Sequence, residues 1–117
     1  MSRRHCFALD LVDDDSLIQE YQRVHGPGCV WPEVIDHIRR RGILDMQIWQ
    51  RDDRLFMIIE TSDDYPRPVT DAVARDANER WENLMSTFQL RLARADSEKW
   101  APMRPIFELS EHSGKAS

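Results

Sequence analysis

Residues 54–60, RLFMIIE, place apolar side chains on both faces of a predicted strand, and few small folds accommodate such a strand. Neighbouring side chains of a strand point to opposite faces. The five apolar residues therefore divide into Leu55, Met57 and Ile59 on one face and Phe56 and Ile58 on the other. We expect the chain's own helices to cover one face, and a second subunit or a ligand pocket to cover the other.

Hydrophobic periodicity predicts the remaining elements in the order strand, two helices, hairpin, helix, strand. The predicted strands are residues 4–12, 43–50, 54–60 and 106–109. The predicted helices are residues 13–25, 31–42 and about 68–92, the last with a candidate break at 76–78. Asp14, Asp15 or Ser16 is the expected N-cap of the first helix, and residues 94–105 are expected to form a loop.

This order of elements is typical of an α+β fold. We expect a ferredoxin-like four-stranded antiparallel sheet with helices on one face. Pairing of two such sheets through their free faces would give a dimeric α/β barrel, and hence a homodimer. The chain has 117 residues, 41% of them hydrophobic, which suits one domain over residues 1–109 followed by a polar tail at 110–117.

The charge of the chain argues against nucleic acid as a partner, and its short apolar runs argue against a membrane span. Sixteen Lys and Arg residues against 21 Asp and Glu give a formal net charge of −5, and the basic residues are scattered apart from residues 39–41. A nucleic-acid surface would concentrate them. No apolar run has the length of a membrane span, and the first residues do not resemble a signal peptide. With only two cysteines, Cys6 and Cys29, we expect a soluble, cytoplasmic protein.

Residues 20–34, EYQRVHGPGCVWPEV, end one predicted helix on a histidine and begin the next on a tryptophan. Tyr21 and His25 are four residues apart, so they share one face of the helix and can converge on one small molecule. A histidine exchanges protons near neutral pH, and a tyrosine can orient a hydroxyl beside it. The alternative is that Tyr21 is a core residue and His25 a favourable cation at a helix C-terminus.

Two further residues are candidates for contact with a ligand. Trp81 can stack on a ligand, although aromatic residues at helical spacing more often belong to the core. Glu82 can accept hydrogen bonds from ligand hydroxyls, or it can be a solvated residue of the helix surface. The four histidines show no HxH or HExxH spacing, and Cys29 has no partner at zinc-finger spacing, so we expect no metal.

The sequence resembles the L-rhamnose mutarotase family in EYQRVHGPGCVWPEV, in ERWENLM of the third helical region and in the terminal PIFEL, over residues 4–109. The resemblance implies a small cytosolic ferredoxin-like dimer. Such a protein would be an isomerase that interconverts the α and β anomers of a 6-deoxy-L-hexose without metal or cofactor. It further implies that His25 transfers the proton and that Tyr21 and Trp81 contact the sugar.

Several positions depart from the family's pattern. Met46 stands where a sugar-contacting tyrosine is usual, a tryptophan pair is reduced to Trp81 and Glu82, and the link at residues 26–30 is longer. A carboxylate in place of an indole favours a sugar that presents a hydroxyl there, so L-fucose joins L-rhamnose as a candidate substrate. Two other functions stay open: a cofactorless oxygenase of the dimeric α/β-barrel type, and a non-catalytic sugar-binding or regulatory module.

Overall fold

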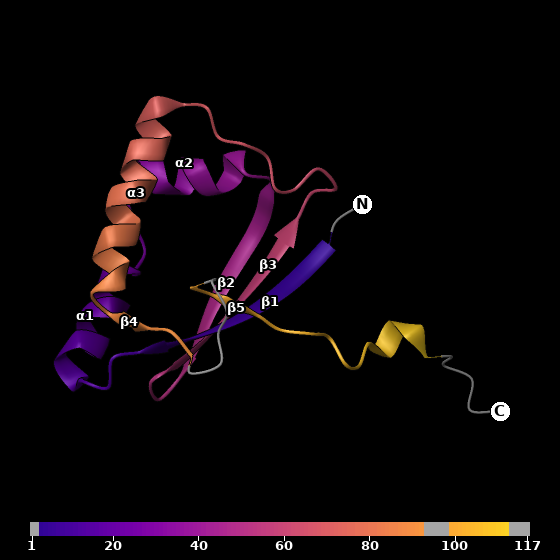
Figure 1. Ribbon diagram of the computed structural model, residues 1–117, viewed down its shortest axis with the longest axis horizontal. Coiled ribbons are helices and arrows are strands. Elements are labelled where there is room, and N and C mark those ends of the chain that lie inside the picture. Colours follow the sequence, from indigo (N-terminus) through magenta and orange to yellow (C-terminus); the bar gives the residue numbers. More distant parts are fainter. Residues whose placement is uncertain (1–2, 93–98, 113–117) are drawn as a thin grey trace.

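Three helices gather on one side of an antiparallel sheet, and the C-terminal segment runs away from this body (Figure 1). The structure is a computed structural model that describes residues 3–92 and 99–112. In chain order the elements are β1 Arg3–Leu11, α1 Asp15–Val24, α2 Pro32–Arg40, β2 Ile43–Arg51, β3 Arg54–Thr61, α3 Ala72–Ser86, β4 Gln89–Leu90, β5 Ala101–Pro102 and the 3-10 turn η1 Leu109–Glu111.

Short acidic side chains fix where the helices begin. Asp14 is the N-cap of α1, and its Oδ1 accepts from the backbone N–H of Leu17 at 3.0 Å. Asp71 caps α3 in the same way, accepting from the N–H groups of Val73 and Ala74. α3 continues through residues 76–78, so the candidate break was wrong. Ala77 is only 2% exposed there, because that turn of the helix packs into the core.

The sheet order is β2-β3-β1-β4 with every pairing antiparallel, which confirms the ferredoxin-like arrangement. The β2–β3 hairpin is also confirmed, and its turn places Asp52 at a φ of 51°. The face of β3 that carries Leu55 and Ile59 is covered by the helices, and these two residues are 1% and 2% exposed. The core between helices and sheet is formed by Leu11, Tyr21, Val34, Leu55, Ala77, Trp81, Met85 and Phe88.

The opposite face of the sheet is less covered, as the pattern of β3 predicted. Phe56 and Ile58 are half-buried there, and Trp49, which stands opposite Phe56 in the register, is 61% exposed.

The fourth strand position is divided between two short strands, and the prediction of a last strand at residues 106–109 was wrong. β4 and β5 both pair with β1, through Leu11 opposite Gln89 and Phe7 opposite Pro102. Continuing the β5 register would place residue 106 opposite Arg3, the first residue of β1, so residues 107–109 would lie beyond the described end of that strand. Pro105 also lacks the N–H that a ladder needs. In the described part of the chain the sheet consequently has five strands rather than four.

The segment beyond β5 runs away from the body of the fold as an arm (Figure 1). Ile106 is 93% exposed, Phe107 65% and Leu109 74%. The turn η1 overlaps the start of the predicted polar tail, whose residues 113–117 lie outside the described part of the chain. Among the described residues, no helix is long and apolar enough to cross a membrane.

Candidate functional site

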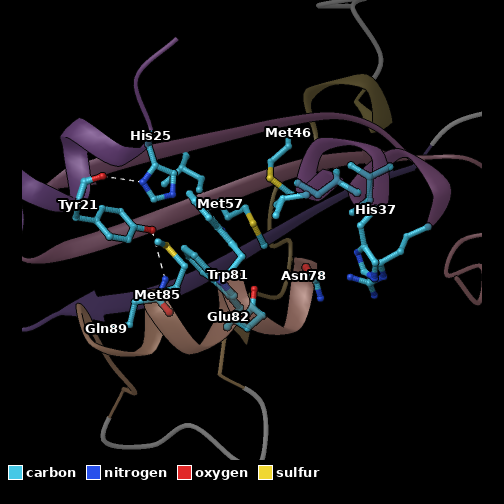
Figure 2. Close-up of a pocket in the computed structure, with 16 residues that line it drawn as sticks. Tyr21, His25, His37, Met46, Met57, Asn78, Trp81, Glu82, Met85 and Gln89 are labelled. Atoms are coloured by element: carbon cyan, nitrogen blue, oxygen red, sulfur yellow. Dashed lines mark hydrogen bonds between the residues drawn. The ribbon is translucent and has the colours of Figure 1, made fainter. Parts of the chain in front are cut away.

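A cavity of about 140 Å³ lies between the helices and the sheet (Figure 2). It is much smaller than the ~300–1,000 Å³ pockets of drug-sized ligands, so it suits only a small molecule. All four residues singled out from the sequence line it, together with Met46. Those four are Tyr21 and His25 at the end of α1, and Trp81 and Glu82 on α3.

His25 is the C-cap residue of α1, and its ring is held by a local hydrogen bond. Nδ1 lies 2.7 Å from the backbone carbonyl oxygen of Tyr21. A carbonyl only accepts, so Nδ1 carries the proton and the lone pair of the neutral ring is on Nε2. Burial lowers the pKa of His25, while the bond to the Tyr21 carbonyl partly opposes that shift. The imidazole is therefore neutral near pH 7, with Nε2 available as a base.

Tyr21 is 3% exposed and remains a phenol at physiological pH. Burial raises its pKa to about 12, because the phenolate would lose its hydration. Its ring contacts the His25 ring, with 4.2 Å between the centroids. Its hydroxyl oxygen accepts from Gln89 Nε2 at 3.4 Å, which leaves its own proton free to donate into the cavity. The four-residue spacing thus brings phenol and imidazole together, as the sequence predicted.

Trp81 forms an apolar wall of the cavity and is 6% exposed. Its indole meets the His25 ring edge to face, with centroids 5.5 Å apart, and meets Trp31 in the same way at 5.2 Å. Arg80 lies outside the cavity, where its guanidinium is 5.9 Å from the Trp31 ring centroid. Trp31 thus supports Trp81 from behind, which links the tryptophan at the start of α2 to the site.

Glu82 is held at the cavity by a lysine from the segment that was predicted to be a loop. Lys99 Nζ lies 2.9 Å from Glu82 Oε2 and also donates to Ser86 Oγ at 3.1 Å. The next residue, Trp100, lines the cavity as well. No local sequence pattern would have placed these two residues at the site.

Gln89, His37, Arg41 and Asn78 also line the cavity and were not recognised in the sequence. Asn78 could have been found, because it lies three and four residues before Trp81 and Glu82, on the same face of α3. Burial and then the nearby Arg41 charge lower the pKa of His37, while the charges of Glu82 and Asp36 oppose that shift.

No group of three or more His, Cys, Asp or Glu side chains that could hold a metal ion occurs in residues 3–92 and 99–112.

Comparisons with known proteins agree on one family. The sequence model described as L-rhamnose mutarotase matches residues 4–109. An L-fucose mutarotase of Xanthomonas campestris pv. campestris is 43% identical over 114 residues, which cover 93% of this chain and 90% of that protein. A UPF0734 protein of Dictyostelium discoideum is 34% identical over 110 residues, covering 87% of this chain and 86% of its own.

A solved structure supports the fold. The crystal structure of an L-rhamnose mutarotase from Formosa agariphila superposes with a TM-score of 0.63, covering 91% of this chain and 97% of that one. The two sequences are 17% identical, so the likeness bears on the fold alone.

Proposed function

The chain belongs to the L-rhamnose mutarotase family, and we propose that it interconverts the α and β anomers of L-fucose or L-rhamnose in the cavity between helices and sheet. The observation that carries this proposal is the state of His25. Its Nδ1 is committed to the Tyr21 carbonyl, so Nε2 is a neutral base at the cavity. Anomer exchange needs such a group, because a proton must leave one sugar oxygen and reach another.

The proposed reaction moves one proton from O1 to O5 of the sugar and breaks the bond between C1 and O5. His25 Nε2 takes the proton from the O1 hydroxyl while the bond between C1 and the ring oxygen O5 breaks. The resulting imidazolium then gives its proton to O5, which leaves the open aldehyde. Rotation about the C1–C2 bond and the reverse steps close the ring as the other anomer. Because O1 and O5 are both bonded to C1, one imidazole can serve both oxygens.

Tyr21 and Trp81 have supporting roles in this proposal. The Tyr21 hydroxyl donates to O5 and stabilises the negative charge that develops there as the ring opens. The Trp81 indole packs against the apolar face of the sugar. Both residues lie beside His25 in the described structure, with ring centroids 4.2 Å and 5.5 Å from its ring.

Glu82 is proposed to select the sugar. Its carboxylate, held by Lys99, can accept a hydrogen bond from a sugar hydroxyl. Met46 lines the same cavity from β2 without a polar atom that could replace a tyrosine hydroxyl. The proposal therefore favours L-fucose over L-rhamnose, and the relative that is 43% identical is named an L-fucose mutarotase.

The test is anomer exchange followed by saturation-transfer NMR with each sugar. We expect wild-type protein to accelerate exchange, and His25→Ala to remove most of the acceleration, since general acid–base catalysis contributes roughly 10²- to 10⁴-fold. His5→Ala, which changes a histidine of β1 outside the cavity, is the matched control. Exchange at the buffer rate for both sugars would refute the proposal. Sugar binding with unchanged exchange would indicate a binding module instead.

We also propose that the protein is a homodimer through the free sheet face. The support is the apolar surface of Phe56, Ile58 and Trp49, which the helices do not cover. Light scattering after size-exclusion chromatography should give the mass of two chains, and Ile58→Glu should give one chain. Val73→Glu, at a residue of α3 that is 67% exposed, should keep the dimer. A monomeric wild-type protein would overturn this proposal.

A cytoplasmic location is proposed from the thiols. Cys6 and Cys29 are both free, as is usual in a reducing compartment. Cell fractionation tests this, and recovery with secreted proteins would contradict it.

A further inference from the structure

We infer that Gln89 is a positioning residue of this cavity, and that turning of its amide lets the Tyr21 hydroxyl act as hydrogen-bond donor in one step and as acceptor in the next. This inference deepens the proposed mutarotation and rests on it. Gln89 is placed by β4, where it stands opposite Leu11 of β1. That register brings its side chain to the helix side of the sheet, beside Tyr21 (Figure 2).

The hydrogen bonding of Gln89 is incomplete. Its Nε2 donates to the Tyr21 hydroxyl at 3.4 Å, a long bond, and its Oε1 is buried without a hydrogen-bond partner among the described residues. An unpaired buried acceptor is unfavourable and uncommon. Here it belongs to a residue that lines the cavity, so the missing partner points to a role for the amide in the occupied site.

The amide has two orientations that each make one bond to Tyr21. With Nε2 toward Tyr21, as observed, the phenol oxygen accepts and its proton is free for the substrate. With Oε1 toward Tyr21, the phenol donates to Gln89 and turns its lone pairs to the substrate. Each orientation leaves one amide group without a bond to Tyr21, and the terminal torsion of Gln is broad and roughly two-fold, so rotation about it interchanges the two orientations.

Mutarotation uses both states of the phenol. A donor is needed while O5 gains negative charge during ring opening. Once O5 has taken its proton from His25 and is the hydroxyl of the open aldehyde, turning about the C5–O5 bond lets this hydroxyl donate to the Tyr21 oxygen, which then acts as an acceptor. Tyr21 keeps its proton throughout, and no proton is transferred between it and Gln89. Gln89 thus acts on the substrate through Tyr21.

The direct test is the side-chain amide signal of Gln89 in 15N-labelled protein. The two N–H signals missing from the spectrum of Gln89→Met identify it. We expect these signals to shift when L-fucose or L-rhamnose is added. The signals of Gln22, whose amide donates to Gln50 at 2.9 Å on the surface, should stay in place. Unshifted Gln89 signals at saturating sugar would overturn the inference.

Kinetics give an independent reading. Gln89→Met and Gln89→Glu should each lower kcat by about tenfold, the effect of one hydrogen bond, with a smaller change in KM. The methionine side chain has no amide to form a hydrogen bond with Tyr21, and the glutamate carboxylate can only accept one from it. Gln50→Met is the matched control and should keep the wild-type kcat. If His25→Ala loses the acceleration of exchange while Gln89→Met and Gln89→Glu keep the wild-type kcat, this inference is refuted and the proposed function stands. Wild-type protein that neither accelerates anomer exchange nor shows shifted Gln89 signals would refute this inference and the proposed function together.

Discussion

The state of His25 makes a specific prediction for the pH dependence of anomer exchange. Burial lowers the pKa of His25 below its usual 6.5, and the neutral ring is the proposed base. Activity above the buffer rate should therefore be constant near pH 8 and fall at lower pH, with a midpoint below 6.5. A catalyst that needed the imidazolium in its first step would show the opposite slope.

The slope of that fall follows from the number of groups that titrate. One imidazole gives a decrease of about tenfold per pH unit below its pKa. His37 lines the same cavity and its pKa is also lowered by burial, so a fall steeper than tenfold per unit would show that it takes part. His37→Asn separates the two cases, because it should leave the slope and midpoint unchanged if His25 acts alone.

The assay is saturation-transfer NMR at constant ionic strength, with the uncatalysed rate subtracted at each pH. The free energy of unfolding should likewise decrease as the pH falls. The unfolded chain binds a proton at His25 with a pKa near 6.5 and the folded chain binds it more weakly, so folding loses stability as pH falls through 6.5. A midpoint above 6.5, or activity that rises toward low pH, would refute the assignment of Nε2 as a neutral base.

Three further predictions concern Lys99, the core and a helix cap. Lys99→Met should free Glu82 and raise KM by a few-fold, with a stability change of about 0–1 kcal/mol, because Glu82 is 48% exposed in the pair; an unchanged KM would contradict this. Leu9→Ala, at a fully buried residue, should lower the free energy of unfolding in urea by about 2–5 kcal/mol, against about 0.5 kcal/mol or less for exposed Leu44→Ala. Asp71→Ala should cost about 0.5–2 kcal/mol in thermal unfolding, whereas an unchanged midpoint would contradict its role as the cap of α3.

Most of the fold was predictable because its signals are local. The alternation of β1 and β3 and the N-cap of α1 depend on residues a few positions apart. Tyr21 and His25 were predictable as a pair for the same reason, since four residues of helix bring them together. The end of α3 and the last strand were not predictable, because they depend on where β1 ends and on which segments reach its edge.

The sequence by itself determined the order of the elements through α3, the apolar faces of the sheet and the family to which the chain belongs. Only the tertiary structure decided how the site is completed. Gln89 reaches Tyr21 across 68 residues of chain, and Lys99 reaches Glu82 across 17. Such contacts have no period in the sequence, because the geometry of the whole sheet and its helices sets them. His25 and Trp81 could be predicted from the sequence. Gln89, which bonds to the Tyr21 hydroxyl, and Lys99, which pairs with Glu82, could not.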